Sequence, residues 1–233
     1  MRIGGIVPLS LVDYPGRPAL SIFTSGCNLR CPFCHNSELV DGIEETNPER
    51  VLALLKKRAG KLVAVCISGG EPTVQDDLEV FIGRIKSLGY SVKLDTNGSR
   101  PQVLRRLLEE DLLDYVALDI KSSPQGYRAA TGGRLDFETV AEAVAIVKSS
   151  GVSYELRTTA VPGLVNLEDL AIIAQSLKPI ERYVLQQFRP AKTLDPSVGK
   201  VEPYTEEWFR EAKKIFQGKA GEILVRWLIF KDG

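Results

Sequence analysis

Residues 20–36 read LSIFTSGCNLRCPFCHN, a short apolar run that passes directly into a loop with three cysteines. The β-branched and aromatic content of the run predicts a buried strand. The thiols of Cys27, Cys31 and Cys34 then follow within eight residues, and three soft ligands so close together are typical of an iron–sulfur cluster. A cluster of four irons held by three cysteines leaves one iron open to a small molecule, which distinguishes a chemical site from a simple electron carrier.

The rest of the chain alternates apolar, β-branched runs with amphipathic segments, the pattern of repeated βα units and a parallel sheet. Strands are expected at 20–24, 62–68, 91–96, 115–120, 154–159 and 183–187, with a further edge strand at 223–230. Helices are expected at 48–58, 77–88, 101–110, 137–149, 167–177 and 206–216, with caps at Asn47, Ser99 and Asn166. Six βα units are fewer than the eight of a closed barrel. The fold class expected is therefore α/β, an open partial (β/α)6 barrel of the TIM type with its site at the carboxyl ends of the strands.

The 30 basic and 30 acidic side chains of this 233-residue chain cancel, so no global charge favours nucleic acid or an anionic membrane. No apolar stretch reaches a membrane-spanning length, and the amino terminus lacks the apolar core of a signal peptide. We therefore expect a cytoplasmic protein without a nucleic-acid or membrane partner. No linker divides residues 1–233, which are expected to form one domain with a core at about 18–190 and a C-terminal extension at 191–233.

Metal ligation explains the cysteines of a cytoplasmic chain better than disulfides do. Cys66 lies in an apolar run and is expected to be a small buried residue rather than a fourth ligand. A zinc site completed by His35, the only histidine, is the alternative. It is disfavoured because the adjacent Cys34 and His35 would struggle to occupy two corners of one tetrahedron and no second ligand pair follows.

The second predicted strand ends in the sequence SGGEP at residues 68–72. Taken alone, Gly69 and Gly70 are a weak signal, because a glycine pair after a strand often marks only a tight turn. After a cysteine loop the pair gains meaning, since glycines let a ligand approach the backbone closely. Exposed carbonyl and amide groups at such a turn can bind an ammonium or a carboxylate group.

Together these two segments resemble the radical S-adenosylmethionine (radical SAM) superfamily. Its signature, Cys-x-x-x-Cys-x-aromatic-Cys after the first barrel strand, is matched by Cys27, Cys31, Phe33 and Cys34, and residues 69–72 resemble the motif that contacts the methionine amino group. The resemblance implies a partial barrel of the radical SAM type, a [4Fe-4S] cluster on the three cysteines, and SAM bound at the open iron. Reductive cleavage of SAM would yield methionine and a 5′-deoxyadenosyl radical.

Further segments resemble the activating enzymes of glycyl radical enzymes. They are LVDYPG at 11–16, CHN at 34–36, LDTNG at 94–98 and LDIK at 118–121. The resemblance is closest to the activating proteins of anaerobic ribonucleoside-triphosphate reductases, with pyruvate formate-lyase activating enzyme nearby. It implies a glycyl radical enzyme as protein substrate and a place for Asp13 near the glycine-bearing loop of that partner. A plain turn explains Asp13 equally well.

Asp95 and Asp119 are expected to end adjacent strands and so to share one rim of the sheet. They would face the sulfonium of SAM or, as the resemblance to activases suggests, a monovalent cation that bridges to the SAM carboxylate. Helix capping or a salt bridge between Asp119 and Lys121 is the alternative. Lys121 itself would pair with the carboxylate of a bound amino acid or lie solvated in a loop.

Arg157 stands inside the predicted strand 154–159 and needs a partner there. The resemblance implies a contact with SAM, and an ion pair with Glu155 is the alternative. The stretch 186–190 is a candidate contact for the adenine or ribose. Activases of the pyruvate formate-lyase type tend to use a histidine in this late region, and the chain has none after His35.

Three classes of function remain open at this point. The favoured one is an activase that removes hydrogen from a glycine of a partner enzyme, with a flavodoxin or ferredoxin as electron donor because no cysteines remain for a second cluster. The second is a radical SAM enzyme on a small molecule, similar to 7-carboxy-7-deazaguanine synthase. The third is a non-catalytic zinc or redox-binding protein. The sequence identifies neither the partner, the donor nor the oligomeric state.

Overall fold

The computed structural model describes residues 1–43 and 46–227 and divides the chain into two compact units. Unit 1 comprises Met1–Asn28, Glu38–Ala117 and Glu142–Ser153. Unit 2 comprises Leu29–Ser37, Leu118–Ala141 and the chain from Tyr154 onward. The eight strands of the described residues belong to one open sheet in which their order follows the chain. The α/β class predicted from the sequence is confirmed.

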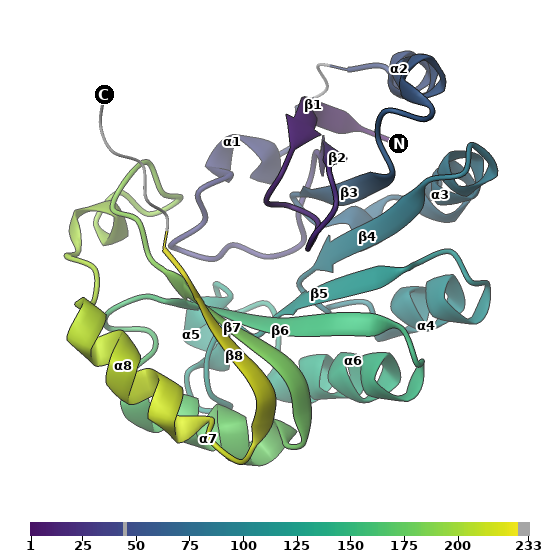
Figure 1. Cartoon of the computed structure of the whole chain (residues 1–233). Helices are drawn as coiled ribbons and strands as arrows, with labels where there is room; N and C mark the ends of the chain where they lie inside the picture. The colour runs from purple at the N-terminus through teal and green to yellow at the C-terminus, as the bar shows by residue number, and fades with distance from the viewer. Residues whose placement is uncertain (44–45, 228–233) are drawn as a thin grey trace. The chain divides into compact units, whose positions relative to one another are not determined.

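Unit 1 contains an antiparallel hairpin followed by parallel strands. Its strands are β1 (Ile3–Ser10), β2 (Ala19–Thr24), β3 (Ala64–Gly69), β4 (Ser91–Thr96) and the start of β5 (Tyr115–Asp119). β1 pairs antiparallel with β2, whereas β2, β3 and β4 pair in parallel. Its helices are α1 (Ser37–Val40, whose first residue belongs to unit 2), α2 (Pro48–Arg58), the short η1 (Pro72–Val74), α3 (Leu78–Ser87) and α4 (Pro101–Glu109). Figure 1 shows α2 and α3 beside the strands β3 and β4, and α4 beside β5.

Alternation along the parallel strands gives unit 1 an apolar face and a polar face. Leu20 lies next to Val65, and Val65 next to Val92, in adjacent strands, and all three are fully buried. Such a face is the one that helices can cover. The opposite face carries polar groups, since Cys66 pairs in register with Lys93 of β4. The polar face of unit 1 is therefore where its strands carry ionisable side chains.

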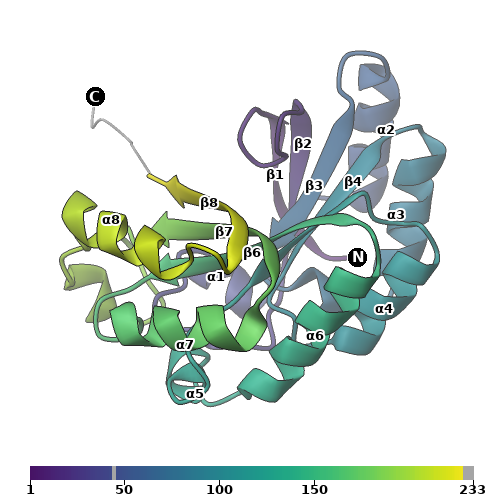
Figure 2. The same cartoon turned by 60° about the horizontal axis from the view of Figure 1, so that its bottom comes forward.

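Unit 2 contains three parallel strands, β6 (Ser153–Ala160, whose first residue belongs to unit 1), β7 (Ile180–Gln187) and β8 (Ala220–Arg226). Its helices are α5 (Tyr127–Ala130), α7 (Leu167–Leu177), the short η2 (Val198–Lys200) and α8 (Glu206–Ile215), while α6 (Phe137–Ser149) begins in unit 2 and ends in unit 1. Figure 2 shows α7 and α8 beside β7 and β8. Phe216, the residue after α8, stacks on Tyr183 of β7 at 4.0 Å between ring centroids. This aromatic contact helps to fix the last helix on the sheet.

The predicted strands and helices match observed elements to within a few residues at each end. Asn47 accepts a hydrogen bond from the backbone N–H of Glu49, and Asn166 forms a capping box with Asp169. The predicted cap at Ser99 is wrong. The residue before α4 is Arg100, which makes no side-chain cap, and the hydroxyl of Ser99 accepts a hydrogen bond from the side chain of Asn28 instead.

The strand β1 was not predicted. Gly4, Gly5 and Pro8 interrupt its apolar pattern, and glycine and proline are poor strand formers. Proline is tolerated because β1 is an edge strand. The predicted edge strand at 223–230 begins earlier, at Ala220, and its residues 228–230 lie outside the described part of the chain. No helix in the described residues is long and apolar enough to cross a membrane.

Candidate functional site

The cysteine loop follows β2 directly, as the sequence predicts, and its thiols belong to both units. Cys27 is in unit 1, where its backbone N–H donates to the carbonyl of Val40 at 3.1 Å. Cys31 and Cys34 are in unit 2, and the N–H of Cys34 donates to the carbonyl of Cys31 at 3.0 Å. Burial raises the pKa of the Cys34 thiol, and the nearby charge of Lys121 acts against this rise. The thiolate form of such a half-buried group is favoured once a bound metal ion shares its negative charge.

The loop between Cys31 and Cys34 is held from outside by the segment before η2. The N–H of Leu194 donates to the carbonyl of Cys34 at 3.2 Å, and the N–H of Asp195 donates to the carbonyl of Pro32 at 2.9 Å. The ring of His35 stacks on Phe188 with 5.6 Å between centroids. These contacts fix the loop backbone through main-chain groups and the ring of His35.

The glycine pair after β3 packs directly on the backbone that leads into Cys27. Gly69 has a φ of 114°, and a Cβ there would come within 2.7 Å of the carbonyl carbon of Phe23. A Cβ on Gly70 would overlap the carbonyl oxygen of Gly26. The N–H groups of Gly70 and of the next residue donate to the carbonyls of Thr24 and Gly26 at 2.8 and 2.9 Å. Only glycine permits this approach, which fixes the turn against the start of the cysteine loop.

The carboxylate of Glu71 is 1% exposed and points into the protein. It accepts two hydrogen bonds from Thr73, one from the hydroxyl of Thr96 at 2.6 Å, and one from the backbone N–H of Asn97 at 2.7 Å. Burial raises the pKa of Glu71, and these hydrogen bonds act in the opposite direction. Glu71 therefore joins the turn after β3 to the end of β4 and positions both.

Asn97 is a site residue that the sequence reasoning missed. Its side-chain amide lies 3.9 Å from the sulfur of Cys27 and donates to the side chain of Asn28 at 3.2 Å. Its backbone N–H is held by Glu71. The motif LDTNG at 94–98 was recognised, but the direction of this side chain depends on the turn after β4, which no local pattern reveals.

Asp95 and Lys93 lie two residues apart on β4 and share one face of the strand. The ammonium of Lys93 forms an ion pair with Oδ1 of Asp95 and lies 3.7 Å from the sulfur of Cys66. The side chain of Cys66 is buried, as predicted. The sequence reasoning did not single out Lys93.

Asp119 at the end of β5 binds two cations within unit 2. Lys121 and Arg157 reach its two oxygens at 2.9 Å each, and Arg157 also lies 3.9 Å from Glu155. The ion pairs given above as alternatives for Asp119, Lys121 and Arg157 are thus present. Burial alone would lower the pKa of Lys121, but the charge and hydrogen bond of Asp119, together with the nearby Cys31 and Tyr127, raise the pKa. The ammonium of Lys121 lies 5.8 Å from the ring centre of Phe33 in the cysteine loop.

Asp13 lies in unit 1 in the turn between β1 and β2. Its carboxylate accepts a hydrogen bond from the hydroxyl of Ser21 at 2.5 Å, and its backbone N–H donates to the hydroxyl of Ser10 at 3.2 Å. The following residue, Tyr14, is buried against Tyr115 with 5.9 Å between ring centroids. The turn is therefore well anchored on the polar face of unit 1.

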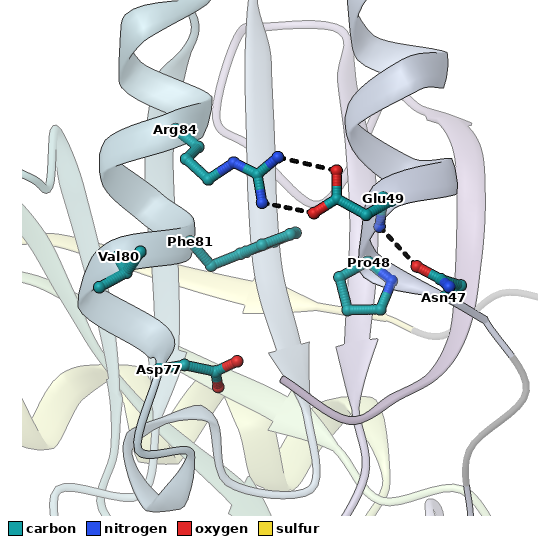
Figure 3. Close-up of a pocket in the computed structure, with 7 residues that line it drawn as sticks. All are labelled: Asn47, Pro48, Glu49, Asp77, Val80, Phe81 and Arg84. Carbon is teal, nitrogen blue, oxygen red and sulfur yellow. Dashed lines mark hydrogen bonds and ion pairs between the residues drawn. The ribbon is translucent and has the colours of Figure 1, made fainter.

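The predicted site residues thus fall into two groups. Unit 1 holds Asp13, Cys27, Gly69, Gly70, Glu71 and Asp95, and unit 2 holds Cys31, Phe33, Cys34, Asp119, Lys121 and Arg157. A hollow of about 190 Å³ lies elsewhere in unit 1, at the N-terminal ends of α2 and α3. Figure 3 shows the paired side chains of Arg84 and Glu49 in it. It contains none of the predicted site residues.

Comparison with known proteins gives the family. The model of the radical SAM superfamily matches residues 21–177, so the chain belongs to this superfamily and is a radical SAM enzyme. A Methanocaldococcus jannaschii protein with the provisional name glycyl-radical enzyme activating enzyme is 35% identical over 96% of this chain and 95% of its own. The pyruvate formate-lyase-activating enzyme of Clostridium pasteurianum is 32% identical over 79% and 80% of the two chains.

Solved structures confirm the partial barrel. SuiB of Streptococcus suis, bound to its precursor peptide SuiA, aligns with a TM-score of 0.67 at 14% identity. The alignment covers 89% of this chain and 48% of that one. At this identity the likeness shows the fold alone. The family implies a [4Fe-4S] cluster and SAM, and the donor set fits: one loop carries three thiols, and within unit 1 the backbone that leads into Cys27 packs on a glycine turn that no larger residue could form.

Proposed function

We propose that the chain is the activating enzyme of a glycyl radical enzyme, such as an anaerobic ribonucleoside-triphosphate reductase. The observation that carries this proposal is the relationship to the Methanocaldococcus jannaschii protein over nearly the whole length of both chains. In the proposed reaction a 5′-deoxyadenosyl radical takes a hydrogen atom from the Cα of one glycine of the partner. The products are 5′-deoxyadenosine and a glycine-centred radical.

Cys27, Cys31 and Cys34 are the proposed ligands of the cluster. The chemistry supplied by such a cluster is one electron for the cleavage of SAM to methionine and a 5′-deoxyadenosyl radical. Asn97 would donate a weak hydrogen bond to the Cys27 sulfur, an interaction that stabilises a thiolate ligand. The electron is proposed to come from a flavodoxin or ferredoxin, because the fourth cysteine of the chain, Cys66, is a buried strand residue.

The remaining site residues are proposed to bind and orient SAM. Gly69 and Gly70 would present backbone groups to the methionine part, because a turn without side chains lets a ligand approach the backbone. Glu71 would help to orient SAM indirectly, through the backbone groups that its carboxylate holds in place. Lys121 and Arg157 would keep Asp119 in one orientation and leave a net positive charge beside it, which suits a carboxylate ligand.

A protein substrate, rather than a small molecule, is supported by an apolar segment that leads to Asp13. Four large apolar side chains in six residues are 40–78% exposed there: Val7, Leu9, Leu11 and Val12. Contiguous exposed apolar side chains are typical of protein interaction sites. We propose that this apolar segment contacts the partner enzyme close to its glycine loop.

The test is an anaerobic reaction of the reconstituted enzyme with SAM, a reductant and a glycyl radical enzyme of the same organism. Electron paramagnetic resonance should show a glycine-centred radical on the partner. The double variant Leu11→Asp/Val12→Asp should still form 5′-deoxyadenosine but little glycyl radical. If 5′-deoxyadenosine forms and no encoded glycyl radical enzyme acquires a radical, the activase proposal is wrong. The same reaction with a pterin-derived carboxylate then tests the small-molecule alternative.

A further inference from the structure

The side chain of Lys93 lies buried in the middle of unit 1. Lys93 is on β4, its side chain is 1% exposed, and its register neighbour on β3 is Cys66. Its ammonium group reaches Oδ1 of Asp95 and lies 3.7 Å from the sulfur of Cys66. The flanking residues on the other face, Val92 and Leu94, are fully buried and apolar. A charged side chain therefore stands where a strand would otherwise carry an apolar one.

Such a placement needs a compensating charge. Moving an ammonium group out of water is costly, and an ion pair with good geometry offsets this cost. Among the described residues, the carboxylate that meets this ammonium is that of Asp95. The positive charge beside Asp95 is thus part of the folded chain.

The same holds for the second carboxylate that the sequence linked to a monovalent cation. Asp119 has Lys121 and Arg157 on its two oxygens at 2.9 Å. Both carboxylates therefore already have cationic side chains from this chain. Na⁺ or K⁺ at Asp95 would share one carboxylate with the Lys93 ammonium, and two positive charges so close together repel each other. The residues present do not fit a monovalent cation at Asp95.

We propose that Lys93 is a positioning residue whose ammonium group takes the place of a monovalent metal ion at Asp95. It neutralises and orients this carboxylate, so the protein requires no Na⁺ or K⁺ there. The proposal concerns the fold around Asp95 and does not depend on which molecule the enzyme acts upon. Its failure and the failure of the activase proposal are therefore separate results.

The experiment compares thermal unfolding of the full chain in sodium, potassium and tetramethylammonium chloride at one ionic strength. Wild type should unfold at the same temperature in all three salts. Lys93→Met removes the ammonium group from Asp95. The unfolding temperature of this variant should therefore rise in Na⁺ or K⁺ but not in tetramethylammonium, and the rise should saturate with salt concentration. At a cation concentration ten times the dissociation constant, the unfolding temperature of this variant should rise by about 3–6 °C. Lys93→Met/Asp95→Asn should lose this selectivity, and Lys93→Arg should behave as wild type.

Two results would overturn the proposal. One is a saturable stabilisation of wild type by Na⁺ or K⁺ over tetramethylammonium that Asp95→Asn removes. The other is a folded Lys93→Met variant that shows no preference among the three cations. If Lys93→Met does not fold, the comparison of wild type with Asp95→Asn decides the question. Unfolding temperatures that are the same in all three salts for both proteins support the proposal.

Discussion

A methyl group at Gly70 tests how closely the turn after β3 must approach the cysteine loop. In Gly70→Ala, the new Cβ would overlap the carbonyl oxygen of Gly26 and lie 2.8 Å from its carbonyl carbon. An ordinary contact between carbon atoms is about 3.5 Å. The contact between the new Cβ and the carbonyl carbon therefore requires the two segments to move apart by about 0.7 Å. Both neighbours are backbone atoms, which cannot move aside as the end of a side chain could. The turn and the loop must therefore separate.

The energy of this separation follows from what it strains and breaks. Overpacking of a close contact costs about 1–3 kcal/mol. The hydrogen bonds from Gly70 to Thr24 and from Glu71 to Gly26, at 2.8 and 2.9 Å, contribute about 1 kcal/mol each and would lengthen. We expect a loss of about 3 kcal/mol in the free energy of unfolding. For a chain of this length, that lowers the unfolding midpoint by about 6–12 °C.

Gly83→Ala is the matched control for the same chemical change. Gly83 lies inside α3, and a Cβ there would meet nothing within 4 Å. Alanine stabilises a helix interior by about 0.8 kcal/mol relative to glycine, so the midpoint should rise by about 2 °C. Thermal unfolding followed by circular dichroism under anaerobic conditions measures both variants. A midpoint of Gly70→Ala within 2 °C of wild type, about the size of the control shift, would refute the reasoning.

Two further predictions concern buried and half-buried carboxylates. Glu71→Gln places an amide NH₂ against groups that already donate hydrogen bonds, among them the N–H of Asn97. It should lower the free energy of unfolding, measured in urea, by about 1–3 kcal/mol. An unchanged urea midpoint would show that the carboxylate is not the acceptor. Asp119→Asn removes the carboxylate that Lys121 and the buried Arg157 share, although Arg157 keeps its 3.9 Å contact with Glu155, and should cost about 2 kcal/mol. Asp136→Asn, which breaks an exposed ion pair with Arg128, should change stability by less than about 0.5 kcal/mol, and equal losses in both variants would contradict this account.

The regular elements were predictable because their apolar periodicity is strong. The helices Pro48–Arg58 and Phe137–Ser149 and the strand Ser91–Thr96 have the predicted bounds. The strand β1 was not predictable from a local pattern, because its glycines and proline weaken it and pairing with β2 supplies its stability. The cap at Ser99 failed for a related reason: its hydroxyl serves a residue far away in the sequence, Asn28.

The candidate site was predictable as motifs and not as contacts. The cysteine loop and the glycine turn are recognisable because the chemistry fixes both residue type and spacing. The role of Glu71 depends on where β4 ends beside the turn, and that of Lys93 depends on the register of β4 with β3. Register is a property of the paired strands, and a single strand read alone does not contain it.

The central claim is that Cys27, Cys31 and Cys34 hold a cluster that cleaves SAM. The most direct measurement is anaerobic reconstitution with iron and sulfide, followed by reductant and SAM, with iron content and 5′-deoxyadenosine as readouts. Wild type and Cys66→Ala should each bind about four irons per chain and form 5′-deoxyadenosine, whereas Cys31→Ala should lose both. Wild type with bound iron but no 5′-deoxyadenosine, or Cys31→Ala with undiminished product, would contradict the account.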